Sequence, residues 1–555
     1  MSVGTLERQG IMGLLSIRNA SAGSLSTKSS AEVRSDLLAR REIALLDVRE
    51  EAEHAEGHPL FAANLPLSRI ELEAPIRLPR QSTPIVVFDA DNKQRLAQRA
   101  AERLLAMGYR DVKLLADGLD GWRNAGFEVF RDVNAPSKAF GELVEARKLT
   151  PSLSAHEVKG LIDAKADIMI LDVRRFDEFH TMSIPTATSV PGAELVLRVR
   201  ELAPDLSTRV IVNCAGRTRS IIGAQSLINA GVPNPVTALR NGTIGWTLAN
   251  QRLEHGAAQK FREVSPDQQA IAAASARRVA DKAGVARIDL PTVSKWLEDE
   301  QRTVYRFDVR TPEEYGTGHL PGFLNAPGGQ LVQETDFFAP VRGARIVLVD
   351  DDGVRANMTA SWLAQMAWEV AVVDAVSPAE FSDRGLRHES PALPSVPNDA
   401  WIEPSQLHDW LQDEREHAVA VLDFAPSRIY AQRHIPGAWF ALRSQFSEVL
   451  QAVPVADRYV LTSPDSTLAH LAWPEAIPLT SRPVHLLVGG TDAWNAQGFQ
   501  IDSSSPKYAS PPIDRYRRPY EGIDATPTAM QAYLDWEHGL VEQLDRDGTH
   551  AFRVI

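Results

Sequence analysis

One pattern of hydrophobic and polar positions occurs four times along the chain of 555 residues. In each copy a helical pattern leads to a short apolar run, typical of a buried strand, that ends at an aspartate. These aspartates are Asp47, Asp172, Asp308 and Asp423. Their intervals of about 115 to 136 residues are too long for a solenoid repeat and match the size of whole domains.

The elements after each aspartate also recur in a fixed order. A second apolar run is followed by an alanine-rich helical pattern and a closing strand; these second runs are Pro84–Phe88, Val210–Asn213, Ile346–Val349 and Tyr459–Thr462. A glycine–tryptophan turn closes three copies and places Trp122, Trp246 and Trp494 as expected core anchors. Alternation of strands and helices predicts α/β domains, each with a parallel sheet flanked by helices on both faces.

The copies divide the chain into four predicted domains, at residues 29–132, 150–262, 285–388 and 398–503. We expect residues 1–28 to form a disordered leader and residues 504–555 a partly helical C-terminal extension. Residues 133–150 are interpreted as a linker with at least one helical turn, and Ser265 to Val285 as an alanine-rich helix. Whether the extension is a lid, a dimer contact or a packing brace is left open.

Composition narrows the functional classes. The hydrophobic content of 44% and charged content of 24% are those of a globular protein, and the formal net charge of −13 argues against a general nucleic-acid or membrane binder. No apolar run reaches the roughly 18 residues of a membrane span, so we expect a cytoplasmic protein. A single cysteine, Cys214, excludes an internal disulfide and a cysteine-based zinc site. We expect no metal and no cofactor.

Cys214 begins a loop between a predicted buried strand and a predicted helix. Such junctions lie at the carboxyl edge of a parallel sheet, where backbone amides and a helix N-terminus attract anions. Gly216 permits a tight turn, and Arg217 and Arg219 add positive charge. These features predict a lowered pKa and a reactive thiolate for Cys214. The alternative is that Cys214 is an inert, buried apolar residue.

In the order of these motifs the chain resembles the rhodanese family, as four tandem rhodanese-like domains from about residue 29 to residue 503. The resemblance implies a sulfurtransferase in which Cys214 takes sulfur from a donor such as thiosulfate, becomes a persulfide, and passes the sulfur to cyanide or a thiol. It also implies a substrate-binding loop in which the amides hold the sulfur and the two arginines orient an anionic donor: Ala215, Gly216, Arg217, Thr218, Arg219 and Ser220.

Two positions depart from the family pattern and leave the donor preference open. Arg217 stands where a glycine is common, and Met182-Ser183 replaces a glycine–histidine pair. The expected partners are a small sulfur donor and a thiol or cyanide acceptor; an acceptor protein and the oligomeric state are left open.

In the other copies the position of Cys214 is taken by Asp89, Asp350 and Ser463, which cannot carry sulfur, so those domains are predicted to be inactive. A metal loop at Asp350 lacks the alternating pattern of a calcium loop, so a solvated acidic loop is favoured. A hydrolase nucleophile at Ser463 lacks a glycine elbow.

Asp172 and its neighbour Arg174 are interpreted as supporting, structural residues, because the aspartate recurs in copies without a cysteine. A role for Asp172 as a catalytic acid or base is the alternative. His54 and His180 lie beside acidic residues and are expected at the surface.

Two other functions compete with sulfur transfer. A cysteine phosphatase would keep an arginine six residues after the cysteine, whereas here Ser220 stands at that place and Arg219 one residue earlier. A binding or regulatory scaffold, the second alternative, would explain the three copies without a cysteine and is compatible with one active domain.

Overall fold

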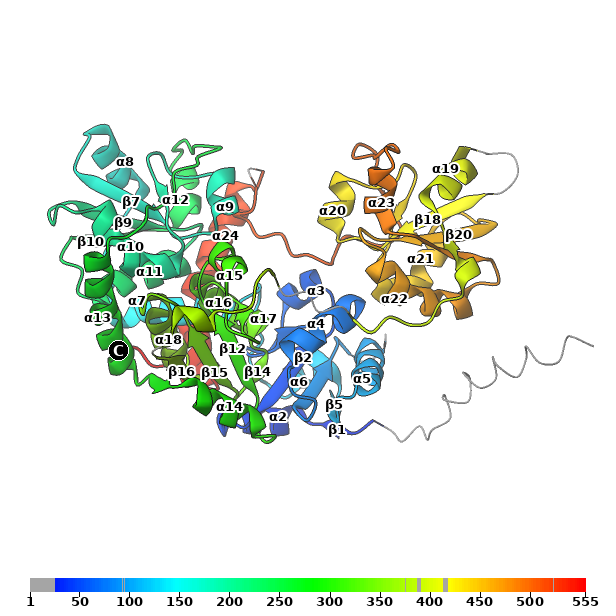
Figure 1. Cartoon of the computed structure of the whole chain (residues 1–555), viewed down its shortest axis with the longest axis horizontal. Coiled ribbons are helices and arrows are strands. Elements are labelled where there is room, and N and C mark those ends of the chain that lie inside the picture. The colour runs from blue at the N-terminus through cyan, green and yellow to red at the C-terminus, as the bar shows by residue number, and fades with distance from the viewer. Residues whose placement is uncertain are drawn as a thin grey trace, which may run out of the picture.

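The computed structural model describes residues 25–91, 93, 95–374, 376–386, 391–412, 418–522 and 524–555. Four sheets follow one another along this part of the chain, and helices surround each of them (Figure 1). The four-domain α/β fold predicted from the repeats is confirmed. Residues 1–24 of the expected leader lie outside the described residues, but its end is ordered, because Thr27–Lys28 forms strand β1 and pairs with β5 (Asp111–Leu115).

The first and second units share one order of elements. The first has the strand order β1-β5-β4-β2, with β3 beside β2, and contains α2 Ser30–Leu38, β2 Ile43–Asp47, α3 Glu51–Glu56, β3 Ala63–Asn64, α4 Ile70–Arg77, β4 Pro84–Phe88, α5 Leu96–Ala106 and α6 Gly118–Asn124. The second has the order β6-β10-β9-β7-β8 and contains β6 Ser152–Leu153, α8 Ala155–Asp163, β7 Ile168–Asp172, α9 Phe176–Thr181, β8 Thr188–Ser189, α10 Leu195–Leu202, β9 Arg209–Asn213, α11 Thr218–Asn229, β10 Val236–Leu239 and α12 Gly242–Leu248.

The third and fourth units repeat this arrangement. The third has the order β11-β16-β15-β12-β13 and contains β11 Ala286–Ile288, α14 Leu290–Glu298, β12 Val304–Asp308, α15 Pro312–Thr317, β13 Leu324–Asn325, α16 Gly328–Gln333, α17 Thr335–Phe338, β14 Val341–Arg342, β15 Arg345–Val349, α18 Arg355–Gln365 and β16 Glu369–Val373. The fourth has the order β17-β21-β20-β18-β19-β22 and contains β17 Trp401–Ile402, α19 Pro404–Gln412, β18 Val419–Asp423, α20 Ser427–Gln432, β19 Trp439–Phe440, α21 Phe446–Ala452, β20 Arg458–Thr462, α22 Thr467–Ala476, β21 Val484–Leu487, α23 Gly490–Ala496 and β22 Lys507–Tyr508.

The first sheet departs from the expected all-parallel pattern at one edge. Strand β14 belongs to the third unit by sequence, yet it pairs antiparallel with β2 of the first unit. One continuous apolar cluster accordingly runs through both units and includes Leu46, Val87, Val341 and Leu348. The first and third units are therefore joined through a shared sheet and a shared core.

Helices between the units hold the assembly together. The segment interpreted as a linker forms α7 (Ala135–Lys148), a buried helix that contacts α11, α16 and α17 of the neighbouring units. The predicted alanine-rich helix is confirmed as α13 (Pro266–Ala283), which packs on α10 and α18. Figure 1 shows the C-terminal extension returning from the fourth unit, with α24 (Pro527–His538) and α25 (Leu540–Asp547) both in contact with α7.

Local signals explain several of these elements. Ser29 caps α2 and Ser154 caps α8, each in a capping box, and Asp289 caps α14. The core role of the three tryptophans is confirmed, since each is buried. Within the described residues no helix is long and apolar enough to cross a membrane.

Candidate active site at Cys214

Cys214 lies directly after β9, in the turn that leads into α11. Its carbonyl oxygen accepts a hydrogen bond of 3.0 Å from the backbone N–H of Thr243, at the start of α12. Gly242 approaches so closely that a Cβ there would lie 2.3 Å from that carbonyl oxygen. Only glycine fits, and with φ of +53° it also adopts the left-handed conformation readily. The turn at Gly242 thus packs directly against the backbone of the cysteine loop.

The thiol is buried, with 2% of Cys214 exposed. Burial raises the pKa of Cys214, because the thiolate loses its hydration, while the positive charge of Arg219 and hydrogen bonds from Ser220 offset part of this rise. The predicted lowering of this pKa is therefore wrong. The sequence shows the favourable charges next to the sulfur, but not that Cys214 lies in a cluster of buried apolar residues.

Arg217 fastens the loop to the buried helix α7. Its guanidinium donates two hydrogen bonds of 2.8 Å to the carboxylate of Glu142, contacts Glu145, and donates to Oδ1 of Asn241 at 3.1 Å. The side chains of Arg217 and Glu142 are both almost fully buried. Three N–H groups of Arg217 thus donate to side chains of the protein itself. The expected role of Arg217 toward an anionic donor stays a prediction.

Arg219 is the cation that acts most strongly on the cysteine. It donates to both carboxylate oxygens of Glu178, in α9, at 2.8 and 2.9 Å. Burial alone would raise the pKa of Glu178, but the nearby arginines, Arg219 foremost, lower it to about 2. Glu178 is thus a permanent anion that fixes the guanidinium beside the loop. The remaining predicted loop residues, Ala215, Gly216, Thr218 and Ser220, are buried.

Asp172 and Arg174 form a buried pair beside the cysteine strand. Arg174 donates to the two carboxylate oxygens of Asp172 at 2.9 and 2.8 Å and to the carbonyl oxygen of Met182 at 2.6 Å. Asn213, the residue before Cys214, donates to the same carboxylate at 2.8 Å. This pair connects the end of β7 to Met182, at the end of α9, and to the residue before Cys214, which supports the structural interpretation.

The corresponding positions in the other units show that the amides of such a loop donate hydrogen bonds to a side chain inside it. The carboxylate of Asp350 accepts hydrogen bonds from the backbone N–H groups of Gly353 and Ala356, at 3.0 and 2.8 Å. In the first unit the carboxylate of Asp89 accepts from the N–H of Ala97 at 3.0 Å. In the first and third units an aspartate side chain therefore fills the space inside the loop. The solvated loop expected at Asp350 is wrong for that residue, which is 8% exposed.

No group of three or more histidine, cysteine or carboxylate side chains suited to a metal ion occurs among the described residues. The surface prediction for the two histidines is half right. His180 is exposed, but His54 is buried, with its Nδ1 2.9 Å from Oδ2 of Asp47 and its ring stacked on His58. Acidic neighbours in the sequence suggested solvent there, whereas the fold turns the imidazole toward the buried aspartate.

A segment that the sequence did not connect with the site covers the cysteine loop. Helix α24 places Tyr533 and Glu537 over Gly216: a Cβ on that glycine would lie 3.3 Å from Oε2 of Glu537 and 3.3 Å from Cε1 of Tyr533. The Tyr533 hydroxyl donates to Oε1 of Glu537 at 2.9 Å. The amphipathic pattern of the extension is the one sequence signal for this contact. It indicates that the helix buries one face, but not which surface that face covers.

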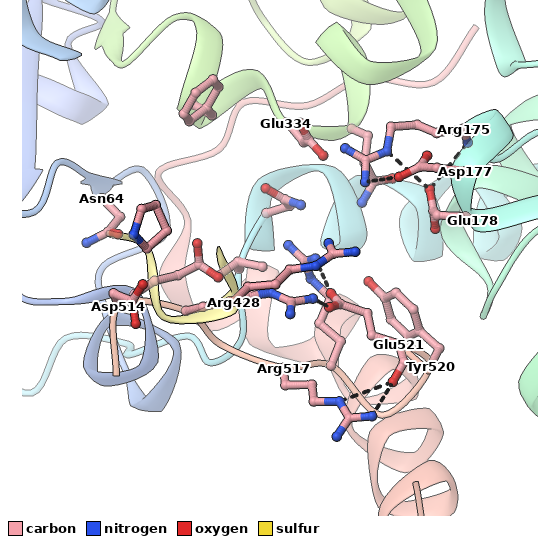
Figure 2. Close-up of a pocket in the computed structure, with 18 of the residues that line it drawn as sticks. Asn64, Arg175, Asp177, Glu178, Glu334, Arg428, Asp514, Arg517, Tyr520 and Glu521 are labelled. Atoms are coloured by element: carbon pink, nitrogen blue, oxygen red, sulfur yellow. Dashed lines mark hydrogen bonds and ion pairs between the residues drawn. The ribbon is translucent and has the colours of Figure 1, made fainter. Parts of the chain in front are cut away.

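A cavity of about 1040 Å³ lies where the units meet. Every unit and the extension contribute to its wall, and Figure 2 shows residues from each of them: Asn64, Glu178, Glu334, Arg428 and Tyr520. Arg219 also lines this cavity. Because Arg219 is part of this wall, the cavity borders the first turn of α11, the helix that follows Cys214.

Comparison with known proteins agrees with this architecture. The family model of the rhodanese-like domain matches residues 30–125, 154–249 and 290–381. The crystal structure of a thiosulfate sulfurtransferase from Pseudomonas aeruginosa is 61% identical, with a TM-score of 0.93, and the match covers 96% of this chain and 100% of that chain.

Matches to smaller structures cover single units. A protein from Anabaena sp. is 25% identical over 19% of this chain and 83% of its own, and a protein from Bacillus halodurans is 23% identical over 20% and 81%; their TM-scores are 0.18 and 0.17. A search among curated proteins finds no significant match. The three matched segments and the near-complete alignment with the Pseudomonas structure show that the chain belongs to the rhodanese-like domain family.

Proposed function

We propose that the protein is a sulfurtransferase that moves sulfane sulfur from a donor such as thiosulfate to a thiol or cyanide through a persulfide on Cys214. The similarity to a thiosulfate sulfurtransferase over nearly the whole chain supports this class of enzyme. The observation that carries the proposal is the position of Cys214, the one cysteine of the chain, in a strand–loop–helix turn, a type of turn that attracts anions. A cytoplasmic location stays a prediction.

The proposed reaction uses the loop as a cradle for the transferred sulfur. The Cys214 thiolate attacks the outer sulfur of thiosulfate, the donor's S–S bond breaks, and sulfite leaves with the electron pair. The persulfide then lies against the loop amides, as the side-chain oxygens of Asp350 do in the third unit. An acceptor thiol or cyanide removes the outer sulfur and restores the cysteine.

We further propose that small donors reach the loop from the central cavity. Cys214 is buried, and the cavity wall includes Arg219, whose charge favours anions near the sulfur. The units without a cysteine then act as supports that form the rest of this wall. A role of these units in docking an acceptor protein is compatible with the same arrangement.

Intact-mass measurement tests the proposal directly, since one thiol makes the result unambiguous. Incubation with thiosulfate is expected to add the mass of one sulfur atom, and cyanide is expected to remove it as thiocyanate. The Cys214→Ser variant serves as the control and is expected to gain no sulfur. Failure of the wild-type protein to gain sulfur from thiosulfate, mercaptopyruvate or a persulfide would refute the proposal. Hydrolysis of aryl phosphates that depends on Cys214 would favour the phosphatase instead.

A further inference from the structure

The fourth unit is attached to the rest of the molecule differently from the other three. One apolar cluster runs through the first and third units, and another combines residues of the second unit with residues of α13 and α18. Among the described residues, the two apolar clusters of the fourth unit contain only residues between 396 and 513. Within that part of the chain, no apolar cluster therefore joins this unit to its neighbours.

Two irregular segments connect the fourth unit to the chain on either side. Figure 1 shows this unit beside the other three; residues 391–397 lead into it and residues 509–522 lead away from it, and neither segment contains a helix or strand. The second segment also bonds to both sides. Oδ2 of Asp514 accepts a hydrogen bond of 2.8 Å from the N–H of Ser427, in the fourth unit. The carbonyl oxygen of Ile513 accepts one of 3.0 Å from the N–H of Ala52, in α3. Irregular segments of this kind are the usual hinges of domain movements.

The contact between the fourth and first units is made of charged and polar groups. Arg443 donates two hydrogen bonds, of 2.7 and 2.8 Å, to the carboxylate of Glu71 in α4, and both side chains are mostly buried. Arg103, in α5, donates to Oε1 of Glu475 at 2.6 Å. Removing such ions from water offsets much of the attraction between them. This contact therefore holds the two units together less firmly than a shared apolar core would.

Docking of the fourth unit also buries a carboxyl group. Glu50 is 2% exposed, and its Oε1 accepts a hydrogen bond of 2.6 Å from the hydroxyl of Ser444, across the contact. Burial raises the pKa of Glu50 to about 7, and Asp514 adds to this rise. Ser444, Arg69 and Ser68 act in the opposite direction. Above this pH the docked form holds a buried anion, which makes docking less favourable.

The central cavity lies along this contact. The first unit contributes Asn64 and Arg77 to its wall. The fourth unit contributes one side of it, through Pro426, Arg428, Ile429 and Gln432. A movement of the fourth unit away from the first carries that side of the wall with it.

We propose that the fourth unit is a gate, which turns on its two connecting segments away from the first unit and opens the central cavity. In the docked form the cavity has a volume of about 1040 Å³. In the open form it becomes a cleft that admits molecules larger than thiosulfate or cyanide. The movement of the gate does not depend on the proposed sulfur transfer.

The test is small-angle X-ray scattering of the full-length protein as sodium chloride is raised from about 50 mM to about 1 M, which shortens the range of ionic attraction. The radius of gyration is expected to rise by about 1 Å or more over this range, from a value near the roughly 24 Å of a compact chain of this length. A radius that stays constant at every salt concentration would overturn the gate.

Two variants of the contact are expected to act in opposite directions. Arg443→Glu places a carboxylate beside Glu71 and Glu475, so the larger radius is expected already at low salt. Glu50→Gln keeps an acceptor for Ser444 but removes the buried charge, so at pH 8.5 it is expected to need more salt than the wild type before its radius rises. A low-salt radius of Arg443→Glu equal to that of the wild type, or an unshifted or lowered salt midpoint of Glu50→Gln, contradicts the gate.

Arg482→Glu is the matched control, because it makes the same change of charge at an exposed arginine that pairs with Asp457 inside the fourth unit. Its radius is expected to equal that of the wild type at each salt concentration, and expansion at low salt would mean general charge repulsion instead of opening at the contact. The salt series of the wild type tests the gate even where a variant does not fold. Scattering reports the position of the fourth unit whether or not Cys214 accepts sulfur, so failure of the gate and failure of the proposed function are separate results.

Discussion

The guanidinium of Arg217 is paired with the carboxylate of Glu142 through two hydrogen bonds of 2.8 Å, and both side chains are buried. Glu142 belongs to α7, the helix that connects the first and second units. The loop that carries Cys214 is thereby anchored to the centre of the molecule. The conformation of this loop therefore depends on contacts between the units and not only on the second unit.

Arg217→Gln is expected to lower the free energy of unfolding by about 3 to 5 kcal/mol, because the carboxylate of Glu142 is left buried without its partner. Urea denaturation measures this loss. The control is Arg147→Gln, which removes an exposed arginine from α7, the helix of Glu142, and is expected to change stability by less than about 0.5 kcal/mol. Equal effects of the two substitutions would contradict the anchoring role.

Arg219→Gln is expected to raise the pKa of Cys214 further, since Arg219 is the charge that most opposes the effect of burial. A shift of one unit would slow alkylation of the thiol about tenfold at a fixed pH below its pKa. The rate of iodoacetamide labelling across pH 7 to 10, followed by intact mass, checks this. Arg200→Gln, a half-buried arginine of the same unit, is expected to leave the labelling profile unchanged. An unchanged labelling profile in Arg219→Gln would mean that Arg219 does not influence the ionisation of Cys214.

Leu540→Ala is expected to destabilise the protein by about 2 to 5 kcal/mol and to expose Cys214. Leu540 is fully buried in a cluster with the core of the first unit, and it begins the helix that follows α24. Loosening it frees the cover of the cysteine loop, so alkylation at pH 10, where access limits the rate, becomes faster. Leu206→Ala, at a site 55% exposed, should change neither quantity. Unchanged alkylation in Leu540→Ala would show that the extension does not limit access.

Much of the fold could be predicted from the sequence because each unit is encoded locally. The apolar runs that end at Asp47, Asp172, Asp308 and Asp423 correspond to strands β2, β7, β12 and β18. The cysteine loop was predictable for the same reason, since its strand, its glycine and its helix are adjacent in the chain. Local order also placed Asp172 and Arg174 together, two residues apart.

The contacts between distant segments could not be predicted in this way. Nothing near Cys214 indicates that Tyr533 and Glu537, more than 300 residues later, cover its loop. The burial of the cysteine, which reverses the expected direction of its pKa shift, is equally absent from the local sequence. Likewise, the two-residue strand β14 has no sequence signal for its pairing with β2. Apolar patterns identify a face that becomes buried, but they do not identify the surface that buries it.

Asp423→Asn is expected to stabilise the protein above pH 8, because the fourth unit has Ala425 where the other units have an arginine. Without that cation, burial raises the pKa of Asp423 to about 7. The folded state therefore holds a proton that the unfolded chain releases near pH 4, so stability is lost as the pH rises toward 7, at about 1.4 kcal/mol for each unit of pKa difference. Asparagine removes this loss, and urea unfolding at pH 5 and pH 8.5 measures it. The matched change Asp308→Asn has the opposite sign, since it removes the buried carboxylate that Arg310 binds and leaves this arginine with Asp351 as its remaining acidic partner. Stabilisation by both substitutions, or by neither, would contradict this account.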